Sequence, residues 1–259
     1  MTNKMSRIFG RFANHAFPKF FQVFINRMYV KIFKIDLNDF DSIETYKTLN
    51  ALFTRKLKKP REFCRNEDTI IAPTDSIITE FGKVKQDRAL QIKGMEYSVK
   101  ELLGEEIDSC YSFINYYLSP KDYHRYHSPC DLRVLEVRYF GGKLLPVNLP
   151  SLKKNQSLFV QNERVVIVAE DKNKEKFFFV AVGALNVGKI LVHFESRVQT
   201  NAIANGRNSF CYDQEILLKK GDEIGMFEMG STVVVFAKNI NLEVSLGQQV
   251  LFGETIGKF

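Results

Sequence analysis

Apolar residues recur every three or four positions over the first 35 residues, the spacing of one face of a helix. Pro18 interrupts this pattern and predicts two helices rather than one. The pattern predicts another short helix from Ser42 to Lys58, with Ser42 as a candidate N-cap. The stripe of the first two helices consists of Phe9, Phe12, Phe17, Phe20, Phe21, Phe24, Met28, Ile32 and Phe33.

From about Thr69 the pattern changes to short β-branched or aromatic runs bounded by Gly, Pro, Asn or Asp. Two later stretches, 219–225 and 246–257, are similar turn-strand units of the kind that builds small sandwiched barrels. We therefore expect an α+β fold, mainly antiparallel β, with a sandwiched-barrel-like core and an amphipathic helical N-terminal region. The expected regions are 1–65 and 66–259. The predicted strands include residues 69–72, 132–139, 165–169, 177–182 and 232–237.

The chain has 259 residues, 45% of them hydrophobic, enough for one large core with an appended subdomain. Its four cysteines are scattered without metal-ligand or paired spacing, which favours a reducing compartment and neither a disulfide framework nor a zinc site. Neither a run of 18 apolar residues nor a secretory signal pattern is present. We therefore expect the protein on the cytoplasmic side of the cell membrane.

The net charge of +7 lies entirely in residues 1–35, which hold seven Lys or Arg and no acid. A basic helix rich in Phe is typical of segments that lie on anionic membranes, so the charge indicates a lipid surface rather than nucleic acid. The alternative, in which these Phe residues pack on their own domain, stays open.

His124 and His127, two of the four histidines, lie between Pro120 and Pro129. Histidine exchanges protons near neutral pH, and such irregular segments often carry site residues. Two surface histidines on a loop are the simpler alternative. A metal site that uses Asp122 with both histidines lacks a further clustered ligand, so we expect none.

Read with its surroundings, segment 119–129 resembles the S-P-x-D-Y-H-R-x-H-x-P pattern of the pyruvoyl-dependent phosphatidylserine decarboxylase family, in its short bacterial form. Further segments resemble the family's patterns in the same order over residues 45–257, which makes the set more specific than any one member. They are L-F-T-R-K-L at 52–57, P-T-D-S at 73–76, N-E-R-V at 162–165, V-G-A with V-G at 182–188, and K-G-D-E-I-G-M-F-E-M-G-S-T-V at 220–233.

The resemblance implies cleavage between Gly230 and Ser231. Gly230 leaves its carbonyl uncrowded, so the Ser231 hydroxyl can attack it and turn the peptide bond into an ester. Elimination and loss of ammonia would then convert Ser231 into a pyruvoyl cofactor at the head of an α chain, 231–259, with 1–230 as the β chain. No metal or pyridoxal phosphate would be needed.

The resemblance also implies an Asp, His and Ser combination that falls on Asp75, His127 and Ser231. His127 would take the Ser231 proton, and Asp75 would fix the imidazole tautomer. The pyruvoyl ketone would form a Schiff base with phosphatidylserine and accept electrons as carbon dioxide leaves. His124 would contact the substrate carboxylate and later protonate the carbanion. Ser76 replaces a glycine that is common in the family's loop.

Other functions stay open at this point. A serine hydrolase could use Asp75, His127 and Ser231, although Ser231 lacks a G-x-S-x-G elbow. A noncatalytic adaptor could dock on lipid through its N-terminal helices. The expected partners of the enzyme are phosphatidylserine, an anionic membrane surface and the α and β chains of one precursor, with a homodimer of αβ units left open and no nucleic acid. The enzyme would be peripheral, on the cytoplasmic face of the cell membrane.

Overall fold

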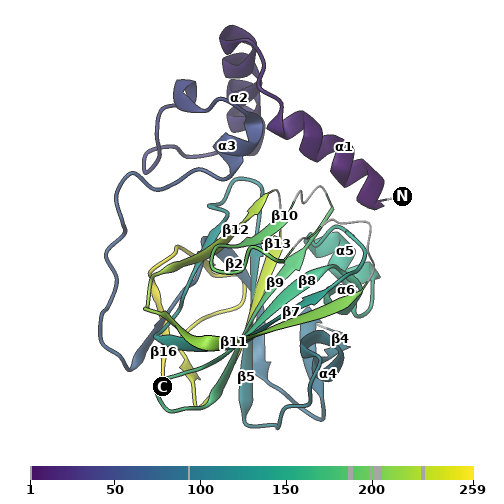
Figure 1. The fold of residues 1–259 in the computed structure, drawn as a ribbon, viewed down its shortest axis with the longest axis vertical. Coiled ribbons are helices and arrows are strands. Elements are labelled where there is room, and N and C mark those ends of the chain that lie inside the picture. The colour runs from purple at the N-terminus through teal and green to yellow at the C-terminus, as the bar shows by residue number, and fades with distance from the viewer. Residues whose placement is uncertain (1, 93, 186–188, 199, 201–205, 229–230) are drawn as a thin grey trace.

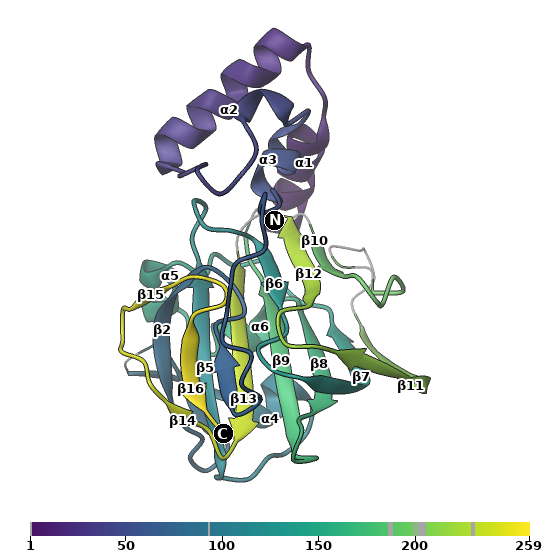
Figure 2. The ribbon, with the colours of Figure 1, turned by 90° about the vertical axis from the view of Figure 1, so that its left-hand side faces the viewer.

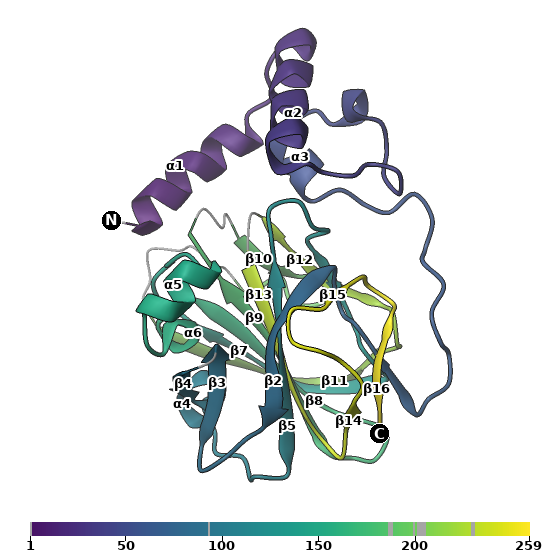
Figure 3. The same cartoon turned by 180° about the vertical axis from the view of Figure 1, so that it is seen from behind.

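The computed structural model describes residues 2–92, 94–185, 189–198, 200, 206–228 and 231–259, without the side chains of residues 2–7 and 231. Three helices gather at one end of a β structure (Figure 1, Figure 2). An extended strap, residues 54–68, leads from them along the outside of the β structure to the first strand. The C-terminus lies at the far end of the β structure from these helices (Figure 3). The architecture confirms the expected class, mainly antiparallel β with a helical N-terminal region.

The first two predicted helices are confirmed. Helix α1 spans Thr2–Asn14 and α2 spans Lys19–Phe33, and Pro18 takes the N-cap position of α2. The predicted helix from Ser42 to Lys58 is wrong in its extent, because only a 3-10 turn, η1 (Ile43–Thr45), and a short helix, α3 (Leu49–Phe53), form there. The Thr48 side chain caps α3 by accepting a hydrogen bond from the Ala51 N–H, which places the true helix start six residues after Ser42.

An eight-stranded antiparallel sheet forms the body of the molecule, in the order β11-β7-β8-β9-β13-β5-β2-β15. All five predicted strands occur, four of them in this sheet and one as β1. The sheet consists of β2 (Ser76–Lys83), β5 (Tyr111–Leu118), β7 (Leu132–Phe140), β8 (Arg164–Glu170), β9 (Lys176–Gly183), β11 (Arg207–Leu218), β13 (Ser231–Lys238) and β15 (Gln249–Val250).

In the part of the chain that the structure describes, three smaller sheets and three short helices complete the body. One sheet joins β10 (Lys189–Val192), β12 (Glu223–Glu228) and β6 (Arg125–His127). A second joins β1 (Thr69–Ile71), β16 (Thr255–Lys258) and β14 (Asn241–Leu242), and a third pairs β3 (Arg88–Ile92) with β4 (Met95–Ser98). The short helices are α4 (Val99–Leu103), α5 (Leu149–Lys154) and α6 (Leu158–Gln161).

The main core lies on the central strands, where β8 and β9 are buried on both faces, as their continuous apolar runs predict. The N-terminal helices have a separate apolar cluster around Leu52 and Phe53. Helix α2 turns a polar stripe inward: Gln22 and Asn26 are buried and hydrogen-bonded to each other, and Asn26 also donates to the Tyr46 carbonyl. The apolar stripe of α2 therefore faces outward.

Candidate active site

The candidate site lies where three neighbouring strands of the large sheet meet at one edge. Ile77, near the start of β2, pairs with Tyr117 of β5. The next residue of β5, Leu118, pairs with Ser231, the first residue of β13. Adjacent strands are about 4.8 Å apart, so the backbones of Asp75 and Ser231 lie near one sheet edge about two strand spacings apart. Gly230 and the Ser231 side chain lie outside the described structure.

The histidine segment leaves this edge through a tight turn. The Asp122 carboxylate accepts hydrogen bonds of 2.7 Å from both the backbone N–H and the hydroxyl of Ser119, which closes the turn. Strand β6 then pairs with β12, and the Phe227 N–H donates to the His124 carbonyl at 2.9 Å. His124 is therefore bonded to Phe227, which stands three positions before Gly230 in the sequence.

His127 is buried, and both of its ring nitrogens have partners. Nδ1 lies 2.9 Å from the Gly221 carbonyl oxygen, and Nε2 lies 3.0 Å from the Tyr123 hydroxyl. The imidazole also stacks on the Phe252 ring, with the ring centroids 3.7 Å apart. A carbonyl can only accept, so Nδ1 carries the proton and Nε2 keeps the lone pair.

Asp75 is buried beside this imidazole but bonds to other groups. Arg61 donates to its two oxygens at 2.5 and 3.1 Å, and the Phe252 N–H donates to Oδ1 at 2.8 Å. Asp75 and His127 thus both contact Phe252, and they make no hydrogen bond to each other among the described residues. Their contact in this state is electrostatic, since Asp75 raises the pKa of His127 as one of its smaller influences.

His124 is fully buried and has an unused nitrogen. Its Nδ1 donates to the Asp122 carbonyl at 2.8 Å, which leaves the lone pair on Nε2. That Nε2 has no hydrogen-bond partner in the described structure. A buried polar atom without a partner costs free energy, and such atoms in native proteins often mark a ligand site.

The N-terminal region contacts this site directly. The Phe53 ring lies 3.9 Å from the His124 imidazole, centroid to centroid. Arg55 is buried and donates to the carbonyls of Lys121 and Asp122, while Arg125 donates in return to the Thr54 carbonyl. The arginine of the L-F-T-R-K-L segment therefore clamps the histidine turn to α3.

Burial controls the protonation state of both histidines. Desolvation lowers the pKa of His127 to about 4, against a smaller opposing effect of its hydrogen bond to Gly221. It lowers the pKa of His124 to about 3, although the hydrogen bond to Asp122 raises it. Both imidazoles are therefore neutral at pH 7 and can accept a proton through Nε2.

The glycines of segment 220–225 are required by close packing. Gly221 has a φ of +86°, and a Cβ there would lie 2.3 Å from the Phe63 ring. A Cβ on Gly225 would lie 1.9 Å from the Leu191 carbonyl oxygen. The K-G-x-E-x-G pattern thus presents the Gly221 carbonyl to His127 and brings β12 against β10.

A cavity of about 270 Å³ opens beside Asp75, between the strap, the loop after α2 and the histidine turn. Its wall carries four cations, Lys34, Arg55, Arg61 and Lys121, and four acids, Asp36, Asp39, Asp75 and Asp122. Arg61 spans it by donating to both Asp39 and Asp75. Among the described residues, no three His, Cys, Asp or Glu side chains cluster in a way that could hold a metal ion.

Sequence reasoning placed Asp75, His124 and His127 at the site but missed Tyr123, Arg61 and Phe252. Tyr123 had a signal, since it stands inside the histidine motif. Arg61 and Phe252 stand outside the motif segments that carry candidate chemistry, and only the fold brings them to the site. The serine at position 76 keeps negative φ, and its hydroxyl bonds to the Thr74 carbonyl, so the loop does not need glycine there.

Comparison with known proteins gives one consistent family. The sequence model of the family described as phosphatidylserine decarboxylase matches residues 49–258. A phosphatidylserine decarboxylase proenzyme of Helicobacter pylori strain J99 is 53% identical over 261 residues, which cover 100% of this chain and 98% of that protein. The proenzyme of Campylobacter jejuni is 41% identical, with 98% of each chain covered.

A more distant relative extends the comparison to mitochondria. The mitochondrial phosphatidylserine decarboxylase proenzyme of Rattus norvegicus is 32% identical over 293 residues, which cover 99% of this chain and 72% of the rat protein. The matches span both the histidine segment and the strand that begins at Ser231. The chain therefore belongs to the phosphatidylserine decarboxylase family.

Proposed function

We propose that this chain is the precursor of a phosphatidylserine decarboxylase that cleaves itself between Gly230 and Ser231 and makes its pyruvoyl cofactor from Ser231. The observation that carries the proposal is that Asp75 and the start of β13 lie at one sheet edge while His124 is hydrogen-bonded to Phe227, just before Gly230, in a chain that matches family proenzymes over its whole length. The word proenzyme in the relatives' names supports processing. The products are chains 1–230 and 231–259.

In the cleavage step, His127 serves as the base. Its neutral Nε2 accepts the Ser231 proton as the serine oxygen bonds to the Gly230 carbonyl carbon, and that proton goes to the amide nitrogen as its bond to the same carbon breaks. The two chains separate when the resulting ester eliminates the Gly230 carboxylate, and water then replaces the nitrogen of residue 231, which leaves as ammonia. Asp75 favours the imidazolium that forms in between, because a buried negative charge nearby stabilises it. Arg61 fixes that carboxylate in place through two hydrogen bonds.

In the decarboxylation step, His124 serves the substrate. The pyruvoyl ketone supplies an electron sink for the carbon–carbon bond that breaks. The partnerless Nε2 of His124 fits a role toward the substrate carboxylate, whose negative charge would raise the pKa of His124 and let it hold a proton there. That proton then goes to the carbon that lost carbon dioxide, so that each turnover takes up one proton.

The N-terminal helices are proposed to hold the enzyme on an anionic membrane. Among the described side chains of α1 and α2, eight large apolar ones are exposed: Ile8, Phe12, Phe20, Phe21, Phe24, Met28, Ile32 and Phe33. Four exposed cations of α2 and its C-cap accompany them: Lys19, Arg27, Lys31 and Lys34. A polar stripe turned inward and an apolar stripe turned outward is the reverse of an ordinary surface helix, and it fits a lipid surface.

This membrane contact makes residues 1–65 a surface-binding region and 66–259 the catalytic domain. No described helix is both long and apolar enough to cross a bilayer. Peripheral attachment at the cytoplasmic face is the proposed location. It brings the histidine site, which Phe53 and Arg55 tie to these helices, to the lipid substrate.

The test compares wild type with Ser231→Ala, His127→Gln and His124→Gln. Purified proteins are analysed by denaturing gel and assayed for phosphatidylethanolamine formation on phosphatidylserine vesicles. We expect wild type to be cut and active, Ser231→Ala and His127→Gln to stay uncut and inactive, and His124→Gln to be cut with activity at least 100-fold lower, the usual range for loss of an acid–base group.

Other outcomes identify the alternatives. Cutting of Ser231→Ala would indicate an outside protease and contradict the mechanism. An intact wild type without activity on vesicles would favour a lipid-bound adaptor. An uncut wild type that releases fatty acid or another ester product would favour a serine hydrolase that uses Asp75, His127 and Ser231.

A further inference from the structure

Tyr123 contacts the nitrogen of His127 on which the proposed base function depends. Its buried hydroxyl lies 3.0 Å from Nε2, and the opposite nitrogen, Nδ1, is held by the Gly221 carbonyl at 2.9 Å. Since Nδ1 donates to that carbonyl, the Tyr123 hydroxyl must donate to Nε2. The imidazole is therefore fixed from both sides, and neither side is Asp75.

The position of the Tyr123 ring is set by packing. It belongs to a small apolar cluster with Phe40, Ile71 and Phe252. Its ring centroid lies 6.0 Å from that of Phe40 and 6.5 Å from that of Phe252. The Tyr123 carbonyl accepts a hydrogen bond from the Thr74 hydroxyl, which links it to the loop of Asp75. Ring packing and this hydrogen bond therefore direct the Tyr123 hydroxyl at His127 Nε2.

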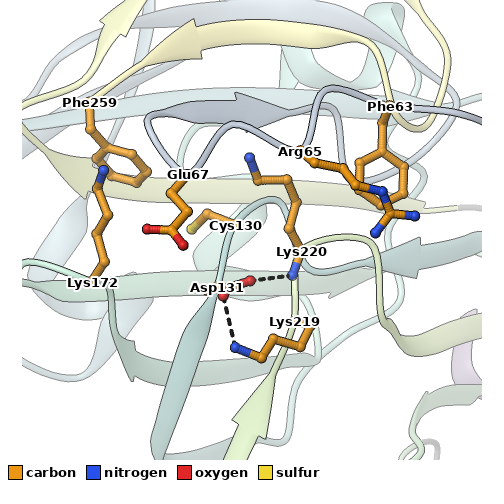
Figure 4. Close-up of a pocket in the computed structure, with 9 residues that line it drawn as sticks. All are labelled: Phe63, Arg65, Glu67, Cys130, Asp131, Lys172, Lys219, Lys220 and Phe259. Carbon is orange, nitrogen blue, oxygen red and sulfur yellow. Dashed lines mark hydrogen bonds and ion pairs between the residues drawn. The ribbon is translucent and has the colours of Figure 1, made fainter.

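The turn that carries the Gly221 carbonyl on the other side is also held by hydrogen bonds. Asp131 accepts hydrogen bonds from the Lys219 ammonium at 3.0 Å and from the Lys220 backbone N–H at 2.8 Å (Figure 4). These bonds fix the turn that carries Gly221 at the wall of a cavity of about 380 Å³. The Lys220 ammonium adds bonds to the carbonyl of Asn66 and the hydroxyl of Thr69.

We propose that Tyr123 is a positioning residue for His127, which holds the imidazole in one orientation and keeps it in the neutral form with its lone pair on Nε2. This inference rests on the proposed function, in which His127 is the base of self-cleavage. As a donor to Nε2, the hydroxyl favours the neutral imidazole, because it must turn and accept instead before Nε2 can hold a proton.

Some charged groups around the His127 imidazole raise its pKa, and others lower it. Glu223 and Asp75 favour the imidazolium, and Arg125 opposes it. Arg125 and Glu223 form an ion pair at 2.5 Å, and Arg61 pairs with Asp75, so these fields are largely balanced. Replacing Tyr123 by Phe changes none of these charges. A shift in the titration of His127 in that variant therefore reports the lost hydroxyl.

The first measurement is nitrogen NMR of the imidazoles in full-length Ser231→Ala precursor, with and without Tyr123→Phe. Only four histidines are present, and His127→Gln identifies the signal. We expect the His127 ring to carry its proton on Nδ1 and none on Nε2. We also expect the pKa of His127 to be about one unit higher in Tyr123→Phe, the effect of one net hydrogen bond. The matched control is Tyr126→Phe, which removes a buried hydroxyl bonded to the Leu191 carbonyl and should leave His127 unchanged.

The second measurement follows self-cleavage of precursor made by cell-free synthesis between pH 4 and 8, with circular dichroism at each pH to verify folding. We expect Tyr123→Phe to cleave about tenfold more slowly at neutral pH, the factor of one hydrogen bond. We also expect the fall in rate at acid pH to begin at a higher pH than in wild type. If Tyr123 had a purely structural role, Tyr123→Phe and Tyr126→Phe would cleave equally slowly, and the pH at which the cleavage rate begins to fall would stay at its wild-type value.

Any of three results overturns the inference. They are a proton on His127 Nε2 in the precursor, an unchanged His127 pKa in Tyr123→Phe, and a cleavage rate of Tyr123→Phe that begins to fall at the same pH as in wild type. Failure of the proposed function is distinguishable from these. If wild type never cleaves, or if His127→Gln cleaves like wild type, the base assignment itself is wrong. If His127→Gln is uncut while Tyr123→Phe matches Tyr126→Phe, only the role of Tyr123 is wrong.

Discussion

Replacing Phe20 and Phe24 by serine should weaken membrane binding without unfolding the protein. The two side chains are 80% and 58% exposed, so together they present somewhat more surface than one fully exposed Phe. Transfer of one Phe side chain out of water contributes about 1.5–3 kcal/mol. If both rings enter the headgroup region, the double variant should lose about 2–4 kcal/mol, or roughly 30- to 1,000-fold in vesicle affinity.

The assay is co-sedimentation of the full-length Ser231→Ala precursor with vesicles of phosphatidylglycerol and phosphatidylcholine. The control is a Leu217→Ser, Leu246→Ser double variant, whose side chains are 57% and 60% exposed but lie outside the N-terminal helices. It removes comparable apolar surface and should bind like its parent. The unfolding free energy of the Phe double variant should stay within about 0.5 kcal/mol of its parent, as for surface substitutions.

Unchanged vesicle affinity in the Phe20→Ser, Phe24→Ser variant would show that these rings do not contact the membrane. An equal loss of affinity in the leucine control would show that binding follows total apolar surface and not the helices. A loss of several kcal/mol in the unfolding free energy would show that these rings pack within the protein.

Further predictions concern the site, and all are measured on the uncut Ser231→Ala precursor. Gly221→Ala should lower the unfolding free energy by about 1–3 kcal/mol, since the added methyl meets a ring and φ is positive; a change under 0.5 kcal/mol in urea unfolding would contradict this. Arg61→Met should lower the unfolding free energy by about 2–4 kcal/mol, because Asp75 stays buried without its cation. An unfolding free energy equal to that of the parent in urea would show that the Arg61–Asp75 pair does not form in solution. Because His127 has a folded pKa of about 4, below its unfolded value near 6.5, stability should be complete above pH 6.5 and fall towards pH 4. His127→Gln should flatten this fall in a series of thermal melts, and an unflattened series would mean that the imidazole is accessible to water.

Much of the fold could be predicted because its signals are local. The break at Pro18 and the apolar runs of β8 and β9 depend on neighbouring residues, and these elements form as expected. The helix predicted from Ser42 failed because a tertiary contact outweighs the local pattern. Leu57 leaves the helical path to form a β-bridge with Phe40, and Thr48 supplies the cap that Ser42 does not.

The site could be predicted only in part, because motifs identify residue types and not their partners. The motif resemblance indicated Asp75 and His127, but Asp75 bonds to Arg61 from the strap and to the Phe252 backbone. The carbonyl that holds His127 belongs to Gly221, 94 positions away. Backbone partners of this kind have no side-chain signature, so they emerge only from the fold.

Conversion of Ser231 into a cofactor can be seen directly in a denaturing intact mass spectrum of the purified wild type. We expect one chain that ends at Gly230 and a second, residues 231–259, that is lighter by the mass of ammonia than the same peptide with a free Ser231 at its head. A single uncut species of 30.0 kDa from an active preparation, or a second chain that still begins with serine, would contradict this conversion.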